Sequence, residues 1–137
     1  MTDLIIWEPS MSVGVAILDE DHKRIMNIIN KLYNAILEGD GKDILDEIFH
    51  DMMAYINIHF EAEEELFAQT CYAGADEQKR QHRLMAQRAT EARQKYEDNK
   101  EAVMPMEIMY FLKDWWIDHI LNTDTKYAAH LHAHGIR

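Results

Sequence analysis

Apolar residues recur every three or four positions in four separate stretches of the chain. This spacing places them on one face of an α-helix, because a helix completes a turn in about 3.6 residues. Gly39, Asp40 and Gly41 end the first stretch, and Pro105 opens the last one. We therefore predict four helices, which run from about Asp19 to Leu37, Lys42 to Gln69, Asp76 to Asn99 and Pro105 to Asn122.

Each predicted helix carries one such stripe, which is typical of helices that pack nearly parallel around a common core. The stripe positions are His22, Ile25, Ile29, Leu32 and Ile36, then Met52, Ile56, His59, Glu63 and Leu66, then Gln78, His82, Met85, Ala89, Ala92 and Tyr96, and finally Ile108, Leu112, Trp115 and His119. Short connections make consecutive helices antiparallel. The predicted fold class is therefore all-α, an up-down-up-down four-helix bundle.

The segments on either side of the predicted bundle are not regular helices. Residues 1–18 contain Pro9 and Gly14 among apolar residues, so we expect an extended N-terminal arm that packs its apolar side chains onto the bundle. Residues 123–137 form a short tail that is partly helical, with three histidines that we expect to be exposed: His130, His132 and His134. With 137 residues, the chain fits a single domain spanning 1–137, with the bundle at about 19–122.

Charge and cysteine content narrow the class of protein. The formal net charge of −11 disfavours binding to nucleic acid or to an anionic membrane surface, which are both polyanionic. The chain has one cysteine, Cys71, which excludes a disulfide within the chain and fits a reducing compartment. No apolar run approaches the roughly 20 residues of a membrane span, and the start of the chain does not resemble a secretion signal. We therefore expect a cytoplasmic protein.

Polar residues occupy core positions on the predicted stripes. A histidine lies on the stripe of every helix, and Glu63 lies one turn after His59, between Ile56 and Leu66. Several unpaired buried ions would together cost on the order of 10 kcal/mol. That cost is comparable with the ~5–15 kcal/mol that stabilises a whole domain. A metal centre compensates for this cost, so the set of polar residues predicts a metal site.

The donor atoms narrow the choice of metal. They are imidazole nitrogens and carboxylate oxygens, and no thiolate lies on a stripe. This set favours iron or manganese over structural zinc. The carboxylates also suit a site with two metal ions, because a carboxylate can bridge two ions and offset part of their charge.

At this point the chain resembles the bacterial hemerythrins over nearly its whole length. The motifs that carry the resemblance occur in order along the chain: Ile17-Leu18-Asp19-Glu20-Asp21-His22, the His-x-x-x-Glu of His59 to Glu63, Trp115 to Ile120 around His119, and Asp124-Thr125-Lys126-Tyr127. Trp7 in an N-terminal arm is also typical of the family. Each motif is short, but their order along the chain, one per helix, makes the resemblance specific.

The resemblance implies a set of ligands and a partner. Members of the family bind dioxygen at two irons that are bridged by a Glu, an Asp and a solvent-derived oxo or hydroxo group. For this chain it implies that His22 and His59 bind one iron, that His82 and His119 bind the other, and that Glu63 and Asp124 bridge them.

Two positions depart from the family pattern. The family has a His-x-x-x-His pair in the third helix, and counting from Glu63 without gaps places Gln78 where the first of these histidines would lie. The neighbouring Glu77 is an alternative ligand, although it lies about 100° away from the stripe. The second departure is Asp21, which stands where a Gln commonly precedes the first histidine. Its side chain either forms a hydrogen bond or carries charge near the site, or is simply solvated, and we favour the solvated interpretation.

Three functions fit these features. The first is reversible binding of dioxygen for storage, delivery or sensing. The second is an enzyme in which the same centre reduces dioxygen, peroxide or nitric oxide, and the third is iron handling or a purely structural bundle. The sequence contains no flavin or iron–sulfur motif that would deliver electrons, which favours binding over catalysis.

Overall fold

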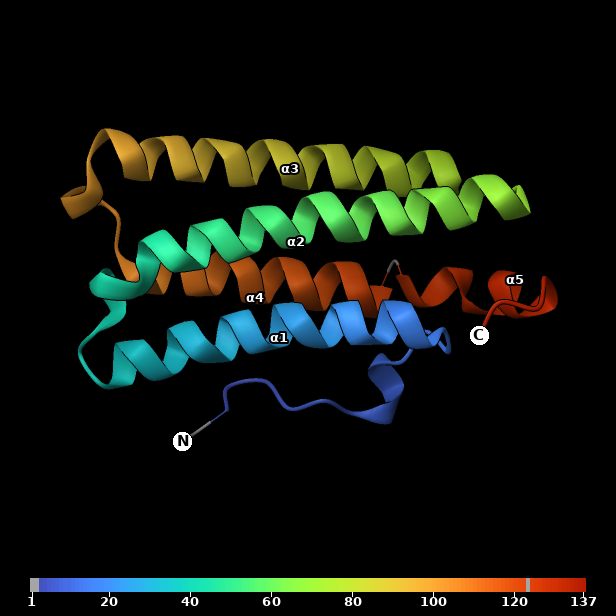
Figure 1. Ribbon diagram of the computed structural model, residues 1–137, viewed down its shortest axis with the longest axis horizontal. Coiled ribbons are helices and arrows are strands. Elements are labelled where there is room, and N and C mark those ends of the chain that lie inside the picture. The colour runs from blue at the N-terminus through green and yellow to red at the C-terminus, as the bar shows by residue number, and fades with distance from the viewer. Residues whose placement is uncertain (1–2, 123) are drawn as a thin grey trace.

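The computed structural model describes residues 3–122 and 124–137 of the chain. Four long helices run back and forth along a common axis (Figure 1), and they are α1 (Ala16–Leu37), α2 (Gly41–Thr70), α3 (Ala75–Asp98) and α4 (Pro105–Asn122). The described ranges contain α-helices and short 3-10 segments but no strand. The prediction of an all-α, up-down-up-down bundle is confirmed.

The largest difference from the predicted boundaries is at the start of α1, which begins at Ala16 rather than Asp19. Asp19 lies inside the first turn, and its carboxylate accepts hydrogen bonds from the preceding loop. The Val13 amide donates to Oδ1 at 2.8 Å and the Ser12 hydroxyl donates to Oδ2 at 2.5 Å. Asp19 therefore holds the end of the arm against the helix, and the helix itself starts one turn earlier.

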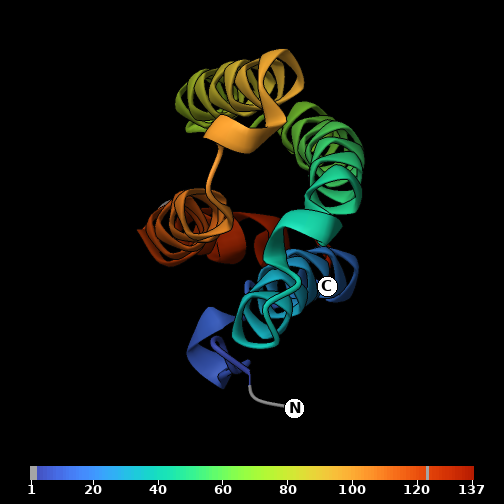
Figure 2. The same ribbon diagram turned by 90° about the vertical axis from the view of Figure 1, so that its left-hand side faces the viewer.

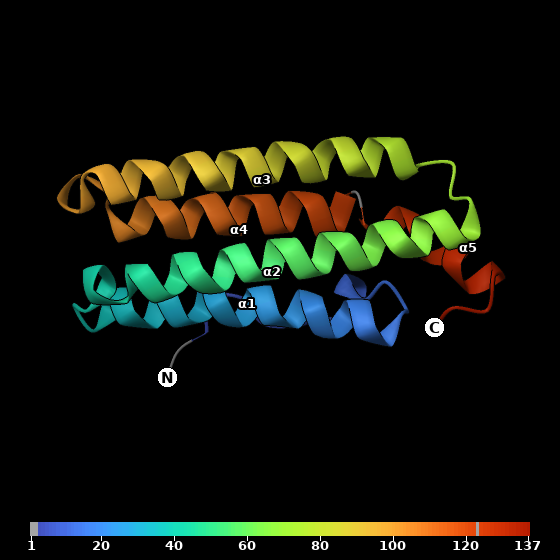
Figure 3. The same cartoon turned by 45° about the horizontal axis from the view of Figure 1, so that its top comes forward.

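Viewed along the bundle axis, the four helices surround a common core (Figure 2). Helix α1 packs against α2 and α4, and α2 packs against α1 and α3. A 3-10 turn, Lys100–Ala102, connects α3 to α4, and neighbouring helices run in opposite directions (Figure 3).

The N-terminal arm lies along α1 (Figure 1) and contains a 3-10 turn, Pro9–Met11. It is held by the buried side chain of Asn30, whose amide bonds both backbone groups of Ile5: its Oδ1 accepts from the Ile5 amide at 2.9 Å and its Nδ2 donates to the Ile5 carbonyl at 2.8 Å. The ammonium of Lys23 lies 5.0 Å from the centre of the Trp7 ring. The arm therefore packs on the bundle as predicted.

The apolar core has two parts. The larger cluster fills the bundle between its four helices and includes Ile29, Leu45 and Leu112. The smaller cluster closes one end of the bundle, where the end of the arm, the end of α2 and the tail meet, and includes Val13, Phe67 and Leu131. The two clusters leave a space for polar side chains between them.

The tail folds back on the end of the bundle instead of extending into solvent. It consists of a 3-10 turn, Asp124–Tyr127, and a short helix α5, Ala128–Ala133. His130 Nε2 donates to the Thr70 carbonyl at 2.9 Å, and His132 Nε2 donates to the Gly14 carbonyl at 2.8 Å. The prediction of exposed tail histidines is therefore correct for His134 and wrong for these two, which are half-buried because their imidazoles cap backbone carbonyls.

Among the described residues, no helix has both the length and the apolar composition that crossing a membrane requires.

Replacing Asn30 by Ala tests the attachment of the arm. The substitution removes two buried hydrogen bonds and leaves the backbone groups of Ile5 without their partner. We expect the free energy of unfolding to fall by about 1–3 kcal/mol, measured by urea denaturation. Asn27→Ala is the control, because Asn27 is exposed on the same helix and should change stability little. Equal losses in both variants would contradict this role for Asn30.

Candidate metal centre

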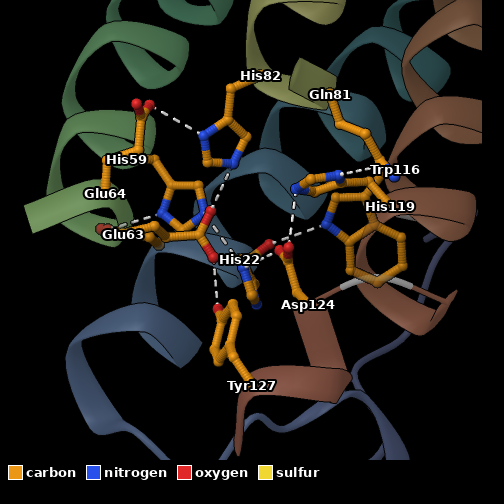
Figure 4. Close-up of polar contacts among 11 residues, drawn as sticks. His22, His59, Glu63, Glu64, Gln81, His82, Trp116, His119, Asp124 and Tyr127 are labelled. Atoms are coloured by element: carbon orange, nitrogen blue, oxygen red, sulfur yellow. Dashed lines mark hydrogen bonds and ion pairs between the residues drawn. The ribbon is translucent and has the colours of Figure 1, made fainter. Parts of the chain in front are cut away.

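The antiparallel order of the helices brings the predicted site residues together at one end of the bundle. His22 and His82 lie near the beginnings of α1 and α3, whereas His59 and His119 lie toward the ends of α2 and α4. Because consecutive helices run in opposite directions, these four positions lie at the same level. Glu63 follows His59 by one turn and Asp124 follows the end of α4, so both carboxylates reach the same level (Figure 4).

All six predicted side chains are buried. None is more than 2% exposed: His22, His59, Glu63, His82, His119 and Asp124. They lie between the two apolar clusters, with little access for water. Burial of two carboxylates at this depth is costly unless positive charge lies beside them.

Each carboxylate lies between imidazoles from different helices. Asp124 places Oδ2 3.1 Å from His22 Nε2 and Oδ1 2.8 Å from His119 Nε2. Glu63 places Oε1 3.1 Å from Nε2 of both His59 and His82.

The donor atoms form two groups of metal-binding size. The first consists of His22, His59, Glu63 and Asp124, and the second consists of Glu63, His82 and His119, with the atoms of each group within 4.8 Å of one another. The two groups share Glu63. This arrangement can hold two adjacent cations with a carboxylate between them.

Three of the imidazoles are oriented by acceptors on their outer side. Asp21 Oδ2 lies 3.1 Å from His59 Nδ1, Glu64 Oε2 lies 3.1 Å from His82 Nδ1, and Gln81 Oε1 lies 3.2 Å from His119 Nδ1 (Figure 4 shows the last two). Oxygen atoms of this kind only accept, so each Nδ1 carries the proton and donates it. In the neutral imidazole the lone pair is then on Nε2, which faces the centre.

The nitrogen and oxygen atoms at the centre of the cluster are better placed to bind a cation than to form hydrogen bonds with one another. Nε2 of His22 lies 3.2 Å from Nε2 of His59, and both oxygens of Asp124 are buried and face imidazole nitrogens. Lone pairs that face lone pairs repel unless a proton or a metal ion lies between them. The donor set therefore fits a pair of metal ions, and the two donor groups share the Glu63 carboxylate.

The pKa values show how strongly the cluster attracts positive charge. Burial disfavours the charged form of His59, but the Glu63 carboxylate and the hydrogen bond to Asp21 outweigh burial and raise its pKa to about 10. The pKa of His119 is also raised, because Asp124 outweighs burial. Burial acts to raise the pKa of Glu63, but the neighbouring imidazoles hold it well below its usual range. Metal ions and protons therefore compete for the same nitrogen atoms.

Tyr127 is a site residue to which sequence analysis assigned no role. Its hydroxyl donates to Glu63 Oε2 at 2.5 Å, and the residue is fully buried (Figure 4). Burial, Glu63 and Asp124 all raise the pKa of Tyr127 well above its usual value, so it remains a donor. The spacing Asp124-x-x-Tyr127 was the available signal, because residues three apart in a helical turn lie on the same side.

Aromatic rings fix the planes of three imidazoles, which sequence analysis also did not predict. Phe60 stacks on His82, with ring centres 4.0 Å apart and an angle of 2° between the planes. Trp115 stacks on His119 at 4.8 Å and 12°, and Tyr55 stacks on His59 at 5.1 Å and 16°. Trp115 is half-buried, whereas its neighbour Trp116 is fully buried and its indole nitrogen donates to the His22 carbonyl at 3.3 Å.

Two further expectations from the sequence have different outcomes. Gln78 is buried on the stripe of α3, one turn before His82, as predicted. Glu77 is exposed and does not reach the centre, because its carboxylate accepts hydrogen bonds from Arg80 at 2.7 and 2.9 Å and from Gln81 at 3.1 Å. These hydrogen bonds lower the pKa of Glu77 to about 2. The alternative that Glu77 supplies a ligand is therefore wrong.

The expectation that Asp21 is solvated is also wrong. Asp21 is 5% exposed and lies between α1 and α2, where it bonds His59. His22 points into the bundle, and the residue before it is turned by about 100° toward the neighbouring helix. A carboxylate at this position therefore faces α2 and not water.

Comparison with known proteins agrees with this geometry. Residues 13–131 match the family described as Hemerythrin HHE cation binding domain, and the chain belongs to this family. A bacteriohemerythrin of Stenotrophomonas maltophilia (strain R551-3) is 27% identical over 131 residues, which cover 96% of this chain and 84% of that protein. A hemerythrin-like protein of Naegleria gruberi is 31% identical over 124 residues, which cover 90% of each chain.

A solved structure shares the fold. The crystal structure of a wild-type hemerythrin matches with a TM-score of 0.82 and 25% sequence identity, covering 93% of this chain and 98% of that one. The fold and the buried donor cluster thus agree with membership of a cation-binding family.

Removing bound cations should destabilise the protein, because the buried carboxylates and imidazoles then lose their counter-charge. At a free cation concentration 100 times the dissociation constant, binding adds about 2.7 kcal/mol, so we expect a chelator to lower the melting temperature by about 10 °C. Differential scanning calorimetry with and without excess ferrous iron under nitrogen provides the measurement. A melting temperature that does not respond to the cation would contradict a metal centre at this position.

Proposed function

We propose that this chain is a non-haem di-iron protein that binds dioxygen reversibly. In this proposal His22 and His59 would hold one iron, His82 and His119 would hold the other, and Glu63 and Asp124 would supply carboxylate oxygens to the centre, with an oxo or hydroxo group completing it. The observation that carries the proposal is the pair of donor groups that share Glu63 within the bundle core. Storage, delivery and sensing are the biological uses that such binding serves.

The chemistry of the donor set supports iron. Imidazole and carboxylate ligands suit iron, and two ferrous ions would supply the electrons and open coordination positions that dioxygen binding needs. The residues of the chain hold the donors in place: outer acceptors fix the imidazole tautomers, stacked rings fix their planes, and Tyr127 holds one oxygen of Glu63.

The surroundings of the cluster support binding over turnover. The inner side chains lie between apolar clusters, and Phe60, Trp115 and Tyr55 cover three of the imidazoles. A buried site with apolar surroundings limits the access of water and protons, which favours reversible binding over reduction. We further propose a cytoplasmic protein, because its one cysteine, Cys71, is free and exposed, which suits a reducing compartment.

Stopped-flow optical spectroscopy of the reduced, iron-loaded protein mixed with dioxygen tests the proposed function. A spectral change that reverses when dioxygen is removed supports binding. Direct conversion to the ferric protein, with continued consumption of dioxygen when a reductant is supplied, would instead support an oxygen-reducing enzyme and contradict the proposal.

Replacing both Glu63 and Asp124 by Ala tests the ligand assignment. The double variant removes the two carboxylates between the proposed irons, and we expect iron content to fall from two per chain to well below one, because outer-partner changes alone already reduce metal affinity about 10–100-fold. Iron is measured by metal analysis after anaerobic reconstitution. Glu61→Ala and Asp114→Ala together are the matched control, because both residues are exposed and carry the same charge. Two irons per chain in the Glu63 and Asp124 variant would overturn the assignment.

Gln78 provides a separate test of how the family pattern applies to this chain. An amide oxygen is a weaker donor than an imidazole nitrogen, so we expect the iron beside His82 to be held less firmly than it would be with a histidine at position 78. Gln78→His should therefore slow the loss of iron to a chelator by about 10-fold or more and slow oxidation of the reduced protein in air. The contrary result is a variant with the rates of the parent protein, which would show that position 78 is not a ligand position.

A further inference from the structure

The four imidazoles of the centre differ in what contacts their outer nitrogen. Asp21, a carboxylate, contacts His59, and Glu64, also a carboxylate, contacts His82. A neutral amide, Gln81, contacts His119, and Nδ1 of His22 has no hydrogen-bond partner among the described residues. The centre is therefore asymmetric in the charge that surrounds its ligands, although its inner donors are similar on both sides.

Burial separates the two carboxylates. The side chain of Asp21 is 7% exposed, whereas that of Glu64 is 34% exposed, so water screens Glu64 much more. Asp21 also lines a cleft of about 320 Å³ between α1 and α2, which has mostly apolar walls. Water therefore screens the contact between Asp21 and His59 less than the contact between Glu64 and His82.

Arg24 moderates the charge on Asp21. It lies one turn later on α1, and its Nη1 is 3.4 Å from Asp21 Oδ1, the oxygen that does not contact His59. Its side chain is 67% exposed, so the ion pair is partly screened by water. Arg24, Asp21 and His59 thus form a chain of contacts that leads from solvent to a proposed metal ligand.

A carboxylate that accepts the Nδ1 proton of an imidazole makes the Nε2 lone pair a stronger donor to a metal. A stronger donor binds a metal more firmly and stabilises its higher oxidation state more than its lower one. Of the four imidazoles, His59 has the most deeply buried carboxylate on its outer nitrogen. The two ions of the centre should then differ in retention and in reduction potential.

We propose that Asp21 is a positioning residue that strengthens His59 as a donor, and that it thereby tightens binding and lowers the reduction potential of the ion held by His22 and His59. Arg24 has the opposite effect, because its positive charge beside Asp21 weakens the effect of the Asp21 carboxylate on His59. This inference rests on the proposed di-iron function, but it concerns the asymmetry of the centre and not its existence.

The test compares variants of the full chain loaded with ferrous iron under nitrogen. Asp21→Asn keeps an oxygen that can accept the His59 proton and removes only the charge. We expect one of the two irons to be lost to a chelator about 10-fold faster than in the parent protein. The reduction potential of the centre, followed by optical titration, should become more positive.

Arg24→Gln provides the reverse test. It should slow the loss of the same iron and make the potential more negative, by a smaller factor of about two to three, because Arg24 is largely exposed. Lys23→Gln is the matched control: it removes the same charge from the adjacent position, but Lys23 contacts Glu20 and Trp7 and not Asp21. Glu64→Gln should change iron loss on the other side less than Asp21→Asn does.

Three results would overturn the inference. The first is an Asp21→Asn variant with the potential and iron retention of the parent, accompanied by loss of retention in Asp21→Ala, because the hydrogen bond alone would then account for the contact. The second is an Arg24→Gln variant that shifts in the same direction as Asp21→Asn. The third is a Lys23→Gln variant that shifts as much as Arg24→Gln. If the parent protein itself retains no iron, the proposed function fails as well.

Discussion

The structure depends on one electrostatic constraint, which is that two carboxylates and four imidazoles share a buried volume from which water is excluded. Such a set is stable only with positive charge among its inner atoms. The raised pKa values of His59 and His119 and the depressed pKa of Glu63 express this demand for positive charge. In a protein that holds metal ions the same demand becomes binding affinity, and binding stabilises the fold.

The rest of the structure positions these donors and closes the bundle around them. The antiparallel bundle brings donors from all four helices to one level, and the second apolar cluster closes the end of the bundle beyond them. Side chains around the donors then set their direction and tautomer, as Glu64 does for His82 and Tyr127 does for Glu63. The tail is part of this arrangement, because Asp124 and Tyr127 both belong to it and His130 anchors it to the end of α2.

The charge around the proposed centre is uneven. One imidazole contacts a buried carboxylate, another contacts a partly exposed one, and a third contacts an amide. A bundle with similar inner donors on both sides can therefore hold two ions with different properties. The difference comes from the helix faces that turn toward a neighbouring helix, where a side chain can touch the outer edge of a ligand without being a ligand itself.

Much of this protein was determined by its sequence alone. The spacing of apolar residues predicted the four helices, because core packing selects residues with the period of the helix. The polar residues on those stripes, such as His59 and Glu63, predicted the cluster, because burial without compensation would be too costly. The tertiary structure decided what spacing along one helix cannot show. Asp21 contacts His59 across two helices, Glu77 turns to Arg80 at the surface, and the tail histidines His130 and His132 cap distant carbonyls. Each of these outcomes depends on which groups face one another across helices and loops, and that is fixed only when the elements pack.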